Sequence, residues 1–311
     1  MKVSGPNSKT PGTQFISGTV SIATDDACIN IVPVHFTYST ATTFKGAENK
    51  TFTALKSIID GRVGTVMKDG KENAGKVKID SALALNEFYT DRNGKEELVS
   101  AKRNEGGFVN IVSALNPDEK QRNTFTCDML ITGATRTEAN PDKNIPEKVI
   151  VKGAIFDFRK ALLPVEFSTT NPGAMNYFEG LGATSREPVF TKVWGRQVSE
   201  TVVNKIVEES AFGDASVREV TSNRKDFVIT GASVEPYVFD DESTITVAEL
   251  NEAIAAREIY LASVKQRQDE YKAQKAAAAA NTPSAFSATT TSPAAAPATN
   301  FVPASNAEFN F

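Results

Sequence analysis

Apolar and polar residues alternate along much of the first 240 positions, which predicts a chain built mainly of β-strands. Successive side chains of a strand point to opposite faces, so a period of two marks a strand with one buried face. The stretches with strand character are residues 15–23, 29–38, 76–90, 108–114, 124–134, 148–160, 162–168, 190–199 and 216–239. Residues 44–60 fit a strand or a short helix equally well, and the pattern leaves this open.

A β-hairpin is predicted around Asn93 and Gly94, because both residues tolerate the positive φ of a two-residue turn. Phe88, Tyr89 and Arg92 would then lie near its tip. A projecting hairpin with rings and cations could clamp a nucleic-acid strand. An ordinary solvated hairpin is the alternative, and this segment alone favours it.

The tetrapeptide Ile-Thr-Gly-Ala occurs twice, at residues 131–134 and 229–232. Four residues are too few to establish an internal repeat. They indicate instead a similar strand geometry in both places, with glycine at a bend of the kind that small barrels require.

A helical period replaces the strand pattern near residue 246. Thr246 and Glu249 have the spacing of a capping box. Apolar residues then recur every three or four positions through about Lys275, at Val247, Leu250, Ile254, Leu261 and Val264. We expect this helix, residues 246–275, to pack on the preceding β domain. A coiled-coil dimer is the alternative, although Arg257 and Gln268 interrupt the heptad.

These elements predict two β domains, residues 15–116 and 124–275, after a flexible arm at residues 1–14. Residues 276–311 are rich in Ala, Pro and Thr and form a tail that cannot build a core of its own. Its tip holds Glu308, Phe309 and Phe311. This tip suits a partner protein with a small apolar pocket beside a basic residue, the alternative being an unselected terminus.

Composition indicates a soluble globular chain. Its 311 residues are 40% hydrophobic, enough for a sizeable core, and the length favours two domains. No apolar run approaches the roughly 18 residues of a membrane span, and the opening residues lack a signal-peptide core. A cytoplasmic protein is therefore expected. The net charge of −4 argues against a duplex-DNA binder, which usually carries a basic excess.

Candidate catalytic chemistry is sparse. Cys28, Cys127 and His35 are too few soft ligands for a zinc site, and no second histidine is present to activate a thiol. The loop at residues 61–75 lacks the glycine spacing and the Lys-Ser/Thr pair of a phosphate loop. We therefore expect no cofactor, no metal and no enzymatic activity. The enzymatic alternative would use the carboxylate pairs Asp240–Asp241 or Glu208–Glu209, but adjacent strand residues point apart.

Two strands combine rings and cations on one face. Residues 190–199 contain the only tryptophan and place Phe190, Lys192, Trp194 and Arg196 together. Residues 148–160 do the same with Lys152, Phe156 and Phe158 among others. Bases stack on rings and phosphates attract Lys and Arg, so such faces suit single-stranded nucleic acid. In the alternative interpretation, the rings belong to the core and the cations edge the sheet.

The segments VIVKGAIFDFRK, PVFTKVWGRQVS and KDFVITGASVEPY, with the terminus NAEFNF, resemble phage-type single-stranded-DNA-binding proteins. The layout is also similar to that of bacterial single-strand-binding proteins, whose terminal tip is more acidic. The resemblance covers residues 120–275 best. It implies an OB fold in the second domain and in the first, so that tandem OB-like barrels precede a long helix and a tail. It also implies a protein that coats single-stranded DNA in replication or recombination, with a tail that recruits partner proteins of those processes.

The resemblance also implies roles for individual residues. The stacking platforms would be Trp194, Phe156, Phe158 and Phe190, and the phosphate contacts Lys152, Lys192, Arg196 and Arg159. Phe88, Tyr89 and Arg92 would be lesser contacts in the first domain. A homo-oligomer is compatible with this interpretation. The competing function is a structural or assembly protein, such as a virion component, that uses the helix and tail for protein contacts. That alternative predicts that the named aromatics are buried.

Overall fold

The computed structural model describes residues 1–140, 145–208, 212, 216–239 and 245–280, without the side chains of 201–208, 216, 218–223 and 278–280. The expected fold class is confirmed: the chain is mainly β, with a closed small barrel and one long C-terminal helix. Residues Met1–Gln266 form one compact unit and Arg267 begins a second. No helix in the described residues is long and apolar enough to cross a membrane.

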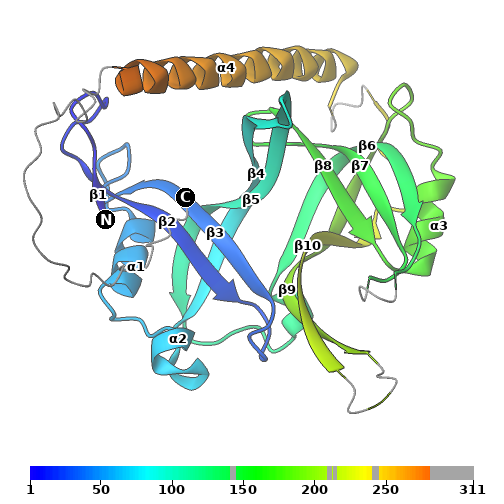
Figure 1. The fold of residues 1–311 in the computed structure, drawn as a ribbon, viewed down its shortest axis with the longest axis horizontal. Coiled ribbons are helices and arrows are strands. Elements are labelled where there is room, and N and C mark those ends of the chain that lie inside the picture. The colour runs from blue at the N-terminus through cyan, green and yellow to red at the C-terminus, as the bar shows by residue number, and fades with distance from the viewer. Residues whose placement is uncertain (141–144, 209–211, 213–215, 240–244, 281–311) are drawn as a thin grey trace, which may run out of the picture. The chain divides into compact units, whose positions relative to one another are not determined.

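Five strands form a first sheet in the order β1-β2-β3-β5-β4 (Figure 1). Neighbours are antiparallel except β3 and β5, which are parallel. The strands are β1 Lys2–Val3, β2 Gln14–Ala23, β3 Ile31–Thr40, β4 Lys76–Arg92 and β5 Lys95–Val112. The first fourteen residues, expected as a flexible arm, thus contain a short strand, and the Ser4 amide donates to the Thr13 carbonyl at 2.9 Å.

The ambiguous segment before β4 is a helix, α1 Lys50–Ile59, followed by the short α2 Val66–Asp69. The Asn49 side chain caps α1 by accepting a hydrogen bond from the Thr51 amide at 3.1 Å. Phe52 and Leu55 are buried in the core of the first sheet. The cap and the three-residue spacing of these two side chains account for the helix.

The next five strands close into a barrel in the order β10-β8-β7-β6-β9. They are β6 Thr124–Thr137, β7 Lys148–Phe156, β8 Leu162–Thr169, β9 Val189–Glu208 and β10 Ser216–Ala232, with α3 Pro172–Gly180 between β8 and β9. Side chains inside the barrel follow the predicted alternation: Val149, Val151 and Val193 are fully buried.

The first sheet and the barrel share one connectivity. In each, the third and fifth strands are parallel and a helix joins the third to the fourth. They differ where the first strand meets the fourth. In the barrel β6 pairs with β9, whereas β4 pairs with β5 alone among the described strands and β1 is two residues long.

Both Ile-Thr-Gly-Ala segments contain a β-bulge. The pairing register shifts between Ile131 and Gly133 in β6, and between Ile229 and Gly231 in β10. Both isoleucines are buried in the barrel core. A bulge bends its strand and increases the local twist, as a small barrel requires. The repeated tetrapeptide therefore records a repeated geometry, as the sequence indicated.

The long helix α4 spans Val247–Ala280 and begins with the predicted capping box. The Thr246 hydroxyl accepts from the Glu249 amide at 3.2 Å, and the Glu249 carboxylate accepts from the Thr246 amide at 3.0 Å. Leu250 packs in a cluster with Leu130 and Phe190 of the barrel. The first turns of α4 thus pack on the second β domain, as expected.

Candidate nucleic-acid interface

The outer face of β9 presents Lys192, Trp194 and Arg196, while Thr191 and Val193 point into the barrel. Trp194 is 41% exposed, Lys192 is exposed and Arg196 is half-buried. Three of the predicted contacts therefore share one accessible face.

Gly231 makes room for the Trp194 ring. A Cβ at Gly231 would lie 2.4 to 2.6 Å from Nε1, Cε2 and Cζ2 of the indole, so the ring covers this glycine. The bulge between Ile229 and Gly231 brings the glycine opposite Trp194 in the β9–β10 ladder. Backbone beneath the ring and exposure above it make a firm flat surface. We call Trp194 over Gly231, with Lys192 and Arg196, the Trp194 platform.

The two cations of the Trp194 platform have different surroundings. Lys192 lies opposite Asp128 in the β6–β9 ladder, and the Tyr237 hydroxyl donates to Asp128 at 3.0 Å. Burial and the Asp128 carboxylate raise the pKa of Tyr237, so its hydroxyl stays protonated and donating at neutral pH. Arg196 has no ion pair within the part of the chain that the structure describes. Lys192 has none there either and is the more exposed of the two, so both cations can meet a phosphate.

Phe190 does not serve as an exposed platform in this structure. It is 5% exposed, and its ring centroid lies 5.2 Å from that of Tyr237 and 6.1 Å from that of Phe239. Phe156 is half-buried against the same cluster, 6.3 Å from Phe190. The chain after β10 folds back over this end of the outer face. These two rings therefore pack in the core, as the alternative interpretation of the sequence pattern predicted.

Phe158 and Arg159 lie in the turn after β7 and are both exposed. Phe158 is 85% exposed, and the Arg159 guanidinium lies 5.0 Å from its ring centroid. The Asp157 carboxylate fixes the turn by accepting from the amides of Arg159 and Ala161, each at 2.8 Å. This pair is accessible, but no described contact joins it to the Trp194 platform. Lys152 is exposed too, with its ammonium 3.5 Å from the Glu166 carboxylate.

The hairpin of β4 and β5 turns at Asn93 and Gly94 as predicted, with φ of 54° and 75°. It is not a free clamp, because α4 contacts it. The Lys265 ammonium lies 5.8 Å from the ring centroid of Tyr89 and 3.0 Å from the Glu96 carboxylate.

The middle of the same hairpin packs on the barrel. The Lys102 ammonium lies 5.5 Å from the Phe227 ring centroid and donates to the Glu166 carbonyl at 2.5 Å. Phe88 and Arg92 remain exposed, whereas Tyr89 is half-buried. The hairpin thus joins the first sheet to the barrel and to α4.

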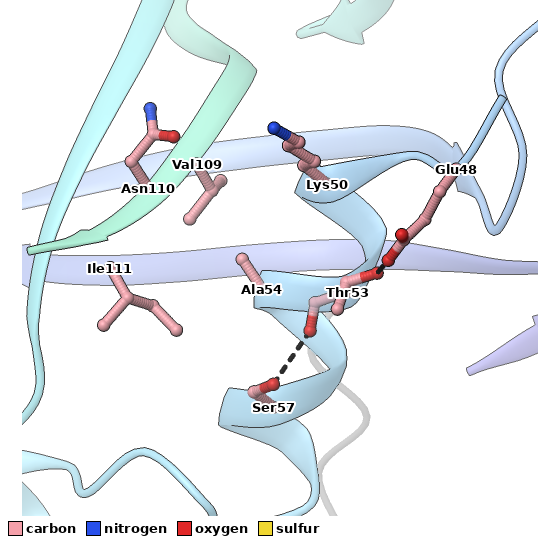
Figure 2. A pocket seen from close by; sticks show the side chains of 8 residues that line it. All are labelled: Glu48, Lys50, Thr53, Ala54, Ser57, Val109, Asn110 and Ile111. Atoms are coloured by element: carbon pink, nitrogen blue, oxygen red, sulfur yellow. Dashed lines mark hydrogen bonds between the residues drawn. The ribbon is translucent and has the colours of Figure 1, made fainter.

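A shallow groove of about 300 Å³ lies between α1 and β5 (Figure 2). Two of its hydroxyls are engaged within the chain: the Thr53 hydroxyl donates to the Glu48 carboxylate at 2.8 Å, and the Ser57 hydroxyl donates to the backbone carbonyl of Thr53 at 2.9 Å. The lining residues are Glu48, Lys50, Thr53, Ala54, Ser57, Val109, Asn110 and Ile111.

Several predicted residues lie outside what the structure describes. The described residues contain no cluster of three or more His, Cys, Asp or Glu side chains that could hold a metal. The side chains of Glu208, Glu209, Asp240 and Asp241 are outside the described part, as are Glu308, Phe309 and Phe311. Sequence reasoning missed Phe108, a strand residue that is 72% exposed, and the role of Gly231.

Over residues 3–267 the chain matches the model of a protein family described as YorF. No match was found among curated proteins or among solved structures.

Proposed function

The chain belongs to the YorF family, and from its geometry we propose that it binds single-stranded DNA without catalysis. The family description states no activity. The observation that carries the proposal is the Trp194 platform: an indole over a glycine, partly exposed, with two cations on the same strand face.

The chemistry of the Trp194 platform fits an unpaired base and its phosphates. Stacking on an aromatic ring contributes about 1 to 3 kcal/mol per base and tolerates any sequence, because every base has a π face. Arg196 and Lys192 lie two residues on either side of Trp194, so both can reach the backbone of a strand that stacks there. Phe158 with Arg159 offers a second ring and cation of the same kind.

The connectivity supports an OB-type assignment for both β units. OB folds are five-stranded, partly open Greek-key barrels that bind oligonucleotides through one strand face and the loops beside it. The barrel has five strands, and its β9–β10 ribbon extends well beyond it (Figure 1). The first sheet has the same strand connectivity. We therefore propose a tandem OB arrangement.

We propose that the protein coats single-stranded DNA during phage replication or recombination, in the host cytoplasm. Glu308, Phe309 and Phe311 would recruit replication or recombination proteins, and the protein could act as a homo-oligomer. A structural or assembly function is the second candidate. The burial of Phe190 and the packing of Phe156 favour it, since that function requires the aromatics to be covered.

The salt dependence of binding tests the proposal. We expect oligo-dT to bind more tightly than duplex of equal length, with a slope of log affinity against log salt of about −0.7 per phosphate contact. Exchanging both Lys192 and Arg196 for glutamine should reduce the slope by about 1.4, because two contacts are lost. Fluorescence anisotropy at several salt concentrations measures both slopes.

Lys9→Gln with Lys45→Gln is the matched control, because both lysines are exposed and far in sequence from β9. This control should leave the slope unchanged. Equal affinity for duplex, or no binding of either nucleic acid, would reject the proposal in favour of the structural candidate.

A further inference from the structure

Phe108 is an exposed ring on the face of β5 that points away from the core of the first sheet. Its side chain is 72% exposed, while its neighbour Val109 is 3% exposed and faces the core of the first sheet. Burying a phenylalanine side chain stabilises a fold by roughly 1.5 to 3 kcal/mol, and the exposed Phe108 ring contributes only a small part of that.

The backbone around Phe108 is built to turn it outward. The β4–β5 register passes from Ile79 opposite Val109 to Ser81 opposite Gly106, so Phe108 lies in an irregularity of the ladder. A Cβ at Gly106 would lie 2.3 Å from the Phe36 ring, which is buried in the core. The glycine at 106 therefore lets β5 approach the core closely, just before the chain turns Phe108 to solvent.

Two lysines share the face of Phe108. Lys78 is opposite Asn110 and Lys76 is opposite Val112. Directly opposed residues lie on the same face of a sheet, so these lysines lie on the side away from Val109. Both are exposed, and neither has an ion pair within the described residues. Asp80, at the register shift between Ile79 and Ser81, is the acidic residue of β4 next to these two lysines.

We propose that Phe108, Lys76 and Lys78 form a second contact for the single strand, on the first sheet. The inference rests on the proposed function and extends it to the other β unit. A ring beside two unpaired ammonium groups matches a base and its flanking phosphates. It replaces the hairpin tip, whose Tyr89 lies against Lys265 of α4, as the nucleic-acid contact of the first sheet.

The path along the chain sets an upper bound on the distance between the two contacts. The Asn104 side chain donates to the Gln197 side chain at 2.8 Å and so joins β5 to β9. Phe108 follows Asn104 by four positions, and Trp194 precedes Gln197 by three. Seven residues at about 3.3 Å each give about 23 Å, and the two linked side chains of Asn104 and Gln197 add roughly 10 Å, so the two strand positions are within roughly 35 Å of each other. About ten stacked nucleotides at 3.4 Å each cover that distance.

Binding of a long and a short oligonucleotide distinguishes the Phe108 contact from the Trp194 platform. Phe108→Ala in the full chain should weaken binding of an oligo-dT of about twenty nucleotides by roughly 5- to 150-fold, because one stacked base is lost. Binding of an oligomer of about six nucleotides, followed by Trp194 emission, should change less than about twofold, because it reaches one platform only. Lys76→Gln with Lys78→Gln should reduce the salt slope for the long oligomer alone.

Phe44→Ala is the control, because Phe44 is another exposed ring of the first β unit. It should bind both oligomers as the unmodified chain does. If both oligomers bind and Phe108→Ala has no effect, this inference is wrong and the proposed function stands. If neither oligomer binds the unmodified chain, the proposed function itself fails. A variant that loses self-association at unchanged DNA affinity would show that Phe108 is a protein contact, which also overturns the inference.

Discussion

Replacing Arg257 with alanine is expected to lower the free energy of unfolding by about 3 to 5 kcal/mol. The Arg257 side chain is 12% exposed, and that of its partner Glu87 is 1% exposed. The guanidinium donates to both carboxylate oxygens of Glu87, through Nη1 at 2.7 Å and through Nη2. Without Arg257, a buried carboxylate loses its cation. Urea denaturation followed by circular dichroism measures the difference.

Two further variants test this explanation. Arg257→Met combined with Glu87→Leu should recover most of the lost stability, because an apolar pair leaves no buried charge. Lys160→Ala removes the exposed ion pair with Glu249 and should cost less than about 1 kcal/mol. If Arg257→Ala were no more harmful than Lys160→Ala, the buried pair would not be what holds α4 to the hairpin.

Trp194→Ala should weaken binding of oligo-dT by about 5- to 150-fold, which corresponds to the 1 to 3 kcal/mol of one stacked base. The thermal midpoint should change little, because the side chain is partly exposed on the outside of the barrel. Anisotropy titration of a labelled oligomer measures the affinity. Unchanged affinity in a folded variant would remove Trp194 from the interface.

Gly231→Ala tests the same platform without removing the ring. The added methyl group would meet the indole at about 2.4 Å, so Trp194 must move. We expect a red-shifted Trp194 emission and an intermediate loss of affinity. Gly133→Ala is the matched control: it occupies the corresponding bulge of β6, and no atom lies within 4 Å of its added Cβ. An equal loss in both variants would point to the bulge rather than the ring.

The parts of the fold that depend on local pattern were predictable. Alternation places Val193 inside the barrel and Trp194 outside, and the Thr246–Glu249 box begins α4 as expected. The Asn93–Gly94 turn also depends on residues adjacent in sequence. Each of these features is decided within a few residues, so the sequence contains the necessary information.

The parts of the fold that depend on residues distant in sequence were not predictable from the local pattern. Phe190 lies on the same face of β9 as Trp194, but Tyr237 and Phe239 cover it. The alternation within β9 cannot predict this cover, because the covering residues come from another part of the chain. Arg257 interrupts the predicted apolar stripe because it binds Glu87. The two residues are 170 positions apart, so the helical pattern alone cannot predict this pair. The exposure of Phe108 depends on a shift of register between two strands.

The central claim is that a single-stranded base stacks on Trp194, and the emission of this tryptophan tests it most directly. Because the chain has one tryptophan, every change in its fluorescence reports on this platform. The unmodified protein should show saturable quenching when titrated with unlabelled oligo-dT, and much weaker quenching with a duplex of matching length. Emission that stays constant while anisotropy shows oligo-dT to be bound would contradict the account, because the strand would then bind elsewhere.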